Sequence, residues 1–245
     1  MADGLLLLHA FPLDARMWDP QRSRLPPGLP VSAPHMPGFG GTERTGAVMT
    51  MRSAAERALS DLHRAGIERA VVCGLSMGGY VAFELWRAAS AVVAGLVLAN
   101  TRAGADTSEG AANRRALADR LRAEGSGFLT EDPPALLSES APPELHAFVR
   151  ELIAEQPAEA IAAASLGMAA RPDSTPDLGR IDVPTLVVTS SRDTLIPPET
   201  SAAMASRVPE ARLAVIEDAG HLSNIEAPDE FTGLLAAHIA RCGVG

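Results

Sequence analysis

The 245-residue sequence predicts an α/β fold built on a doubly wound, mostly parallel sheet of about six strands. Six short apolar runs are continuous rather than alternating, which is typical of central strands covered on both faces. They are residues 4–9, 29–34, 69–75, 91–100, 184–191 and 211–217. Helical patterns separate several of these runs, and the alternation of strand with helix indicates βαβ units.

Four helical patterns belong to this alternating core: residues 53–66, the segment after Ser76, residues 197–208 and residues 227–242. In the first, apolar residues share one face and Gly66 is placed to end the helix. In the last, Pro228 is placed to start the helix. Each pattern therefore predicts a helix that covers the sheet.

Residues 102–178 break the alternation, because they contain three helical patterns (111–124, 142–156 and 157–170) and no convincing strand. An insertion after the fourth strand leaves the sheet at the carboxyl ends of the strands, where α/β proteins bind ligands. We therefore expect residues 1–101 and 179–245 to form the core and residues 102–178 to form a helical cap, or lid. The alternative is a second packing layer that contacts no ligand.

The charge balance excludes several classes of function. With 30 acidic and 21 basic residues the formal net charge is −9, and no basic run is present, so nucleic acid is not an expected partner. All 21 basic residues are arginine, which excludes Schiff-base, pyridoxal-phosphate and P-loop chemistry that needs a lysine.

Cysteine content and the amino-terminal sequence bear on location. Cys73 and Cys242 cannot form a disulfide framework, and Cys73 lies in an apolar run that predicts a buried position. The run GLLLL at 4–8 is too short to span a membrane and lacks the basic start of a signal peptide. We expect a cytoplasmic protein without a membrane partner.

Residues 74–78 read G-L-S-M-G, an instance of G-x-S-x-G. A strand-like run precedes the motif and a helix-like run follows it, as in a strained turn that exposes a serine hydroxyl. Gly74 and Gly78 would remove side chains that collide there, and the amide of Met77 at the helix start could face an oxyanion. An ordinary strand-to-helix turn also fits, and the motif alone leaves both interpretations open.

A serine hydroxyl needs a histidine to take its proton and a carboxylate to orient that histidine. In a fold with this turn, the three residues follow the chain order Ser, then Asp or Glu, then His. Asp193 follows the fifth predicted strand and His221 the sixth, so both should lie at the sheet edge that carries Ser76. Asp106, after the fourth strand, is the alternative acid.

The other five histidines are weaker candidates for the base. His63 and His146 lie in helical patterns with charged neighbours, and His238 lies on the last helix. His9 and His35 end strand-like runs at the active edge: His9 could hold the loop that follows it, whereas His35 has no evident partner. A second oxyanion donor is expected in that loop, HAFPLDARMW.

The amide of Phe11 is placed to be this second donor, since Pro12 has no N–H to donate. The alternative is that HAFP is only a turn.

The chain resembles the α/β-hydrolase superfamily over essentially its whole length, and most closely small esterases, cofactor-free haloperoxidase-like enzymes and 3-oxoadipate enol-lactonase-like hydrolases. The segments that carry this resemblance are LLLLHAFPLDARMW, MPGFGGT, GLSMGGYVA, VPTLVVTSSRDTLIP and AGHLSNIEAPDEF. It implies Ser76 as nucleophile, His221 as general base and Asp193 as orienting acid, with the amides of Phe11 and Met77 as oxyanion donors. Neither a metal nor a cofactor is expected.

Four departures from the family pattern affect the expected structure. Ala10 stands where relatives usually have glycine after the histidine, His35 where an aspartate is frequent, and Ser190 where a glycine is customary. Relatives also usually begin with an antiparallel hairpin, which is missing before the first strand here. We therefore expect a reduced sheet with an exposed edge that a second copy could cover, in a homodimer.

The expected function is that of a serine hydrolase that cleaves a small, largely apolar ester, lactone or thioester through an acyl-enzyme. Five apolar residues are candidates to line its pocket: Trp18, Phe128, Met168, Leu195 and Leu222. For Trp18, Phe128 and Met168, a plain core position is the favoured alternative. The same triad also serves C–C hydrolases, lyases and perhydrolases, which the sequence does not separate. A non-catalytic small-molecule receptor would predict a broken triad.

Overall fold

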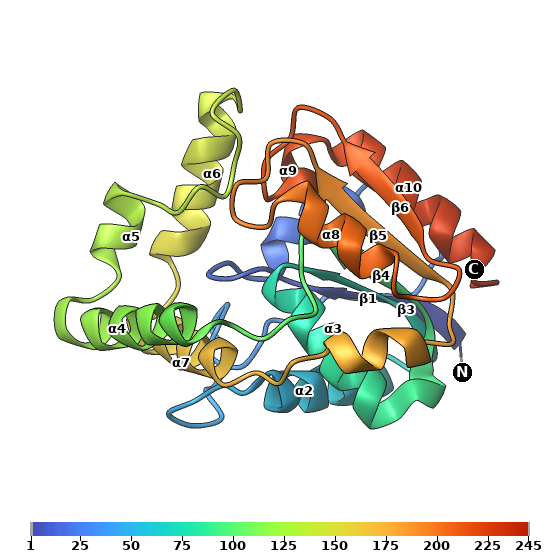
Figure 1. Cartoon of the computed structure of the whole chain (residues 1–245), viewed down its shortest axis with the longest axis horizontal. Helices are drawn as coiled ribbons and strands as arrows, with labels where there is room; N and C mark the ends of the chain where they lie inside the picture. Colours follow the sequence, from blue (N-terminus) through green and yellow to red (C-terminus); the bar gives the residue numbers. More distant parts are fainter. Residues whose placement is uncertain (1, 245) are drawn as a thin grey trace.

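The computed structural model describes residues 2–244 and contains one six-stranded sheet in the order β2-β1-β3-β4-β5-β6 (Figure 1). Every neighbouring pair of strands is parallel. The strands are β1 (Ala2–Leu8), β2 (Val31–Ser32), β3 (Ile67–Leu75), β4 (Val93–Ala99), β5 (Thr185–Ser190) and β6 (Arg212–Ile216). The predicted fold class and the all-parallel sheet are confirmed.

Burial explains why the central strands could be recognised and the edge strands less so. All residues of β4 and β5 are buried, so their sequences are continuously apolar. Strand β6 lies at one edge and exposes Leu213 and Val215. At the other edge β2 has only two residues of the predicted run 29–34, because Pro30 and Pro34 flank it and proline cannot donate to the ladder.

Helices cover both faces of the sheet, with α2 and α3 on one side and α10 on the other (Figure 1). Helix α2 begins after Thr50, whose hydroxyl accepts a hydrogen bond from the N–H of Ser53, and ends before Gly66, where φ is +70°. Pro228 starts α10 as predicted. The helices of the core are η1 (Ala15–Trp18), α1 (Asp19–Arg22), α2 (Met51–Arg64), α3 (Met77–Ala89), η2 (Ser90–Val92), α8 (Pro198–Ala205), α9 (Ser223–Glu226) and α10 (Pro228–Arg241).

Residues 102–178, called the helical insertion below, form a group of helices between β4 and β5. They are α4 (Ser108–Glu124), α5 (Gly127–Glu131), α6 (Pro143–Ala154) and α7 (Ala158–Ala169), followed by η3 (Thr175–Arg180), which runs two residues past the predicted boundary at 178. Helix α4 packs on α7 and α5 on α6, and Figure 1 shows these four helices gathered on the side opposite the chain termini. Helix α5 and η3 were not predicted, since each is short and carries little periodicity.

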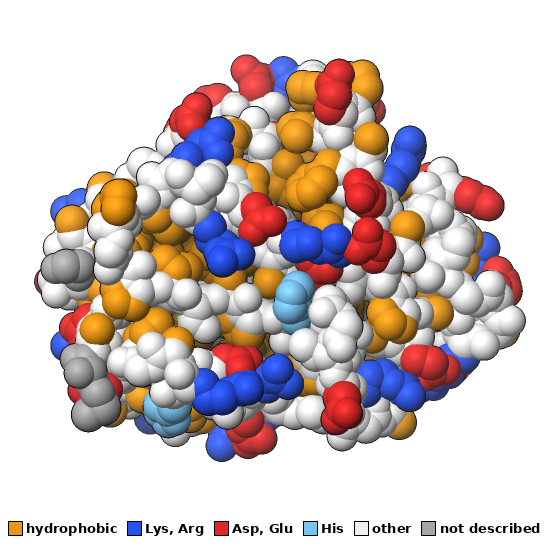
Figure 2. All heavy atoms as spheres, turned by 180° about the vertical axis from the view of Figure 1, so that it is seen from behind, with side chains coloured by type: hydrophobic (Ala, Val, Ile, Leu, Met, Phe, Trp, Pro, Cys, Tyr) orange, Lys and Arg blue, Asp and Glu red, His pale blue; other side chains and the backbone are white. Residues whose placement is uncertain are grey.

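Acidic and basic side chains are interspersed on the face shown in Figure 2, and the described residues form no extended basic patch there. This distribution agrees with the net charge of −9. Across the part of the chain that the structure describes, no helix combines the length and apolarity that crossing a bilayer requires.

Candidate active site

Ser76 occupies a sharp turn between the end of β3 and the start of α3. Its backbone angles are φ 56° and ψ −114°, a combination that a non-glycine residue rarely adopts. Two hydrogen bonds hold the turn: the N–H of Ser76 donates to the carbonyl of Ala99 (2.9 Å), and the Thr101 hydroxyl donates to the carbonyl of Ser76 (2.8 Å). The neighbouring strand β4 and its following loop therefore maintain the turn.

The glycines around Ser76 are needed for close backbone packing. A Cβ on Gly74 would collide with the backbone oxygen of Gly78, and a Cβ on Gly78 would collide with that of Leu8. Because both obstacles are backbone atoms, neither can move aside as a flexible side chain would. The spacing of glycines in the motif thus reflects steric contact at a strand-to-helix corner.

His221 and Asp193 form a buried pair, with 2.8 Å between His221 Nδ1 and Asp193 Oδ2. The other carboxylate oxygen of Asp193 accepts hydrogen bonds from the N–H groups of Leu195 and Ile196, each at 2.9 Å. Burial alone would raise the pKa of Asp193, but hydrogen bonds from His221, Ile196 and Asn100 together with the histidine charge lower it. The carboxylate therefore stays ionised and fixes the direction of the imidazole.

A buried polar network behind this pair was not predicted. The Asn100 amide donates to Asp193 Oδ2 (2.9 Å) and to the Ser190 hydroxyl (2.6 Å), while the Ser223 hydroxyl donates to Asn100 Oδ1 (2.6 Å). Ser190 in turn donates to the carbonyl of Gly220, next to His221. The serine that departs from the family pattern thus links the loop of the acid to the loop of the histidine.

Ser76, His221 and Phe11 line one cavity of about 270 Å³. Asp193 lies behind His221 and does not line the cavity. The complete lining is Phe11, Pro12, Ser76, Tyr80, Arg102, Arg114, Leu117, Leu129, Pro134, Leu136, Met168, Leu195, Ile196 and His221. Ser76 and His221 therefore line the same cavity, and Asp193 contacts His221 from outside it; the three residues come from three separate segments of the chain.

Two backbone amides near Ser76 are candidates for an oxyanion hole. Met77 is the first residue of α3, so its N–H has no partner within the helix. Phe11 lines the cavity, and no residue in the range 2–244 accepts a hydrogen bond from its N–H. Both positions are those expected from the sequence.

The predicted apolar lining needs correction at three of five positions. Met168 and Leu195 line the cavity, but Trp18, Phe128 and Leu222 do not. Trp18 is buried in the core, 5.8 Å from the ring of Phe231. Phe128 packs under the guanidinium of Arg120 at 3.7 Å, and Leu222 is fully buried beside His221.

Asp106, the alternative acid, forms ion pairs with arginines instead of contacting His221. Its carboxylate pairs with Arg102, Arg114 and Arg171 and is almost fully buried. His35 also has a partner that the sequence did not reveal, since its Nδ1 accepts a hydrogen bond from the N–H of Ala15 at 3.3 Å. Among the residues that the structure describes, neither Asp106 nor His35 forms a hydrogen bond with His221.

His9 holds the loop after β1, in keeping with the role considered from the sequence. Its Nδ1 donates to the carbonyl of Ala10 (3.0 Å), and its Nε2 accepts from the N–H of Met36 (2.9 Å). These roles require the neutral imidazole, and complete burial lowers the pKa of His9 to about 4.

Acidification should therefore destabilise the protein through His9. Between pH 6.5 and pH 4 the unfolded chain binds a proton that the native side chain does not, so the free energy of unfolding falls by about 3 kcal/mol from this residue. Urea unfolding at pH 7 and pH 4.5 should show a smaller loss for His9→Asn than for the wild type. Exposed His63→Asn is the control, and equal losses in all three proteins would contradict the assignment.

The loop that carries His221 is joined to the helical insertion by backbone and side-chain hydrogen bonds. The N–H of Leu222 donates to the carbonyl of Leu136 at 2.8 Å. Glu226 accepts from the N–H groups of Gly220 (2.7 Å) and Ser138 (3.1 Å) through the same oxygen. Residues 136–138 therefore position both sides of the histidine.

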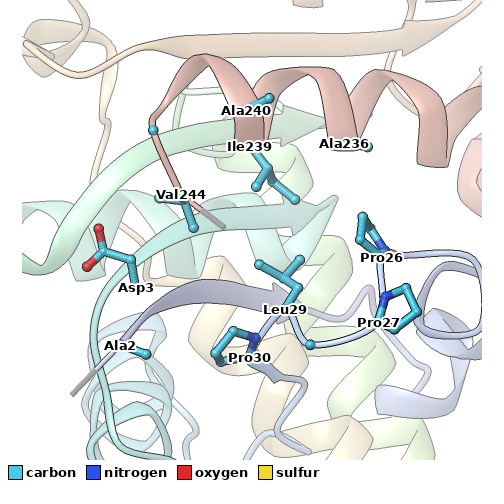
Figure 3. A pocket seen from close by; sticks show the side chains of 12 residues that line it. Ala2, Asp3, Pro26, Pro27, Leu29, Pro30, Ala236, Ile239, Ala240 and Val244 are labelled. Carbon is cyan, nitrogen blue, oxygen red and sulfur yellow. The ribbon is translucent and has the colours of Figure 1, made fainter.

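A larger cavity of about 610 Å³ lies away from Ser76, between the loop at 26–30 and the last helix, α10 (Figure 3). Pro26, Pro27, Leu29 and Ile239 give it an apolar lining, and Asp3 is its one acidic side chain. None of its lining residues is a serine, cysteine or histidine. Size alone would favour this cavity, but the smaller one contains the serine and the histidine that the sequence singled out.

Comparison with known proteins identifies the family of the chain. A model of the alpha/beta hydrolase family matches residues 5–234. The chain is 30% identical to a pimeloyl-(acyl-carrier protein) methyl ester esterase of Aromatoleum aromaticum, over 94% of this chain and 96% of that protein.

Two solved structures are similar throughout. A thermophilic esterase from Thermogutta terrifontis, solved with malate bound, superposes with a TM-score of 0.93 at 41% identity and covers 99% of this chain and 92% of its own. The enol-lactonase from Burkholderia xenovorans LB400 has a TM-score of 0.89 at 26% identity, covering 98% and 92%. The names of these three relatives describe two esterases and a lactonase, which are enzymes that hydrolyse esters or cyclic esters. The chain is a hydrolase and belongs to the alpha/beta hydrolase family.

Proposed function

We propose that this hydrolase cleaves small carboxylic esters or lactones through an acyl-enzyme formed on Ser76. The observation that carries the proposal is that Ser76, on its strained turn, faces the same cavity as His221, which is bonded to the ionised Asp193. A nucleophile, a base and an orienting acid in that relation activate a serine hydroxyl near neutral pH. The names of the relatives support ester and lactone substrates.

In the proposed reaction the Ser76 hydroxyl attacks the substrate carbonyl while His221 takes its proton at Nε2. The negative oxygen of the tetrahedral intermediate accepts hydrogen bonds from the N–H groups of Phe11 and Met77. His221 then gives its proton to the leaving alcohol, and a water molecule hydrolyses the acyl-enzyme by the same steps. Asp193 holds Nδ1 of the imidazole throughout and stabilises the cation that forms.

The cavity favours short substrates. Its volume of about 270 Å³ lies near the lower limit of small-molecule sites. Seven of its lining residues belong to the helical insertion, and five of the seven are apolar: Leu117, Leu129, Pro134, Leu136 and Met168. We therefore propose that the insertion acts as the lid of the site and supplies an apolar surface for the carbon chain of the substrate.

Labelling with an organophosphonate tests the nucleophile directly. A p-nitrophenyl alkylphosphonate should modify the protein at one site and release one equivalent of p-nitrophenol, because attack by Ser76 mimics acylation. Peptide mass spectrometry should place the adduct on the peptide that contains Ser76. An adduct on another residue, or none in a protein that hydrolyses esters, would refute the proposal.

A further inference from the structure

Two arginines contribute to the wall of the cavity that contains Ser76. Arg102 follows β4 and Arg114 lies on α4, and the other lining residues include no aspartate or glutamate. The rest of the wall is largely apolar, with leucine, isoleucine, phenylalanine and methionine side chains. A positive wall in a protein of net charge −9 is a local feature that the overall composition does not explain.

The carboxylate nearest to these arginines does not neutralise them. Asp106 pairs with Arg102 (3.1 Å), with Arg114 and with Arg171 (2.8 Å). Burial by itself would raise the pKa of Asp106, but hydrogen bonds and charges from Arg171 and Arg114 lower it, so it carries one negative charge. Three guanidinium groups around one carboxylate leave a local surplus of about two positive charges.

The three arginines differ in how their N–H groups are used. Arg171 is buried, donates to the carbonyls of Met168 and Gly104 as well as to Asp106, and stacks 4.1 Å from the ring of Tyr80. It therefore has a structural role.

Arg102 donates to Asp106 only through Nη2, and Arg114 only through Nε. Each guanidinium has five N–H bonds, so both retain donors with no partner among residues 2–244. In particular, the Nε of Arg102 is buried and has no acceptor. Two guanidinium groups that each retain N–H donors without an acceptor therefore line the cavity.

We propose that Arg102 and Arg114 form a subsite for a carboxylate, and that the substrate is a short ester or lactone that carries a free carboxylate group. This inference rests on the proposed function and specifies its substrate class. Guanidinium groups bind carboxylates through paired N–H donors, and such contacts are strong where little water is present. The apolar residues that line the same cavity hold the carbon chain, and the small volume of the cavity limits that chain to a few carbons.

Two matched substrate pairs test the subsite. The monoester p-nitrophenyl hydrogen glutarate is compared with p-nitrophenyl pentanoate, which ends in a methyl group, and 3-carboxyphenyl pentanoate with phenyl pentanoate. The wild type should prefer the carboxylated member of at least one pair in kcat/KM. Arg102→Gln and Arg114→Gln should each reduce that preference by about 10- to 100-fold.

Arg115→Gln is the matched control, because Arg115 is the next residue on α4, is exposed and does not line the cavity. It removes the same charge and should leave the preference unchanged. Asp106 keeps two arginine partners in either test variant, so its buried carboxylate is not left unpaired. A loss of preference in Arg115→Gln equal to that in the test variants would refute a local subsite.

Binding measured on the wild type separates this inference from the proposed function. Calorimetry should detect glutarate, which has two carboxylates, binding at least 10-fold more tightly than neutral glutaramide, and Arg102→Gln should weaken glutarate alone. Glutarate binding without turnover of any ester would support the subsite and refute the esterase. Ester hydrolysis without a carboxylate preference in either pair, and without tighter glutarate binding, would refute the subsite alone.

Discussion

Ser76→Ala is expected to lower kcat for short p-nitrophenyl esters by about 10⁴-fold or more, because the lining of the cavity includes no other serine and no threonine or cysteine. The substitution retains the Cβ and removes only the hydroxyl, so the strained turn at φ 56° is preserved. The hydrogen bonds that hold the turn use the backbone of Ser76 and the Thr101 side chain. Stopped or continuous release of p-nitrophenol measures the loss, and the thermal midpoint should change little.

Ser206→Ala is the matched control, since Ser206 directly follows α8, is exposed and does not line the cavity. It should hydrolyse the same esters at the wild-type rate. If Ser76→Ala retained the activity of the wild type, the assignment of the nucleophile would be wrong and the strained geometry of the turn would need another explanation.

Asp193→Asn is expected to reduce kcat by up to about 10⁴-fold. The asparagine amide has the size of the carboxylate, but the N–H groups of Leu195 and Ile196 bind one oxygen of residue 193 and favour an oxygen there. The NH₂ group would then face His221 Nδ1, which could no longer donate its proton. The imidazole would present N–H instead of a lone pair to Ser76 and could not act as base.

The measurement compares kcat for a neutral ester in Asp193→Asn and in Asp218→Asn. Asp218 is exposed, lies three residues before His221 and pairs with Arg192 on the surface. Its replacement should leave kcat close to that of the wild type. An Asp193→Asn protein that is folded and fully active would remove Asp193 from the mechanism.

The central part of the fold was predictable because burial on both faces of β3, β4 and β5 leaves an unambiguous apolar signal. The turn at Ser76 was predictable for a related reason, since glycine at 74 and 78 is required by contact between backbones. The second strand was overestimated, because prolines at 30 and 34 limit the ladder to Val31 and Ser32. Local sequence thus determines these features well.

The walls of the cavity were less predictable, because they depend on which distant segments meet. Nothing in the local sequence distinguishes Leu222, which is fully buried, from Leu195, which lines the cavity. Arg102 and Arg114 have the character of ordinary surface residues until the fold places both beside Asp106 and Ser76. Asn100, likewise, is recognisable as a partner of Asp193 only when strands β4 and β5 are seen side by side.

Two hydrogen bonds join the helical insertion to the segment around His221: the Leu136 carbonyl accepts from the N–H of Leu222, and the N–H of Ser138 donates to Glu226. They limit which changes to the insertion the protein can accept. Exchanging the helices of the insertion for those of a related protein would replace the partners in these hydrogen bonds together with the part of the cavity wall that the insertion supplies. Glu226 and the N–H of Leu222 would then lose hydrogen-bond partners in the insertion. Without equivalent partners, the segment that carries the His221 imidazole would be held less firmly. Under the proposed function, a chimaera that exchanges the insertion is therefore expected to change both substrate preference and turnover, unless its new helices restore these hydrogen bonds.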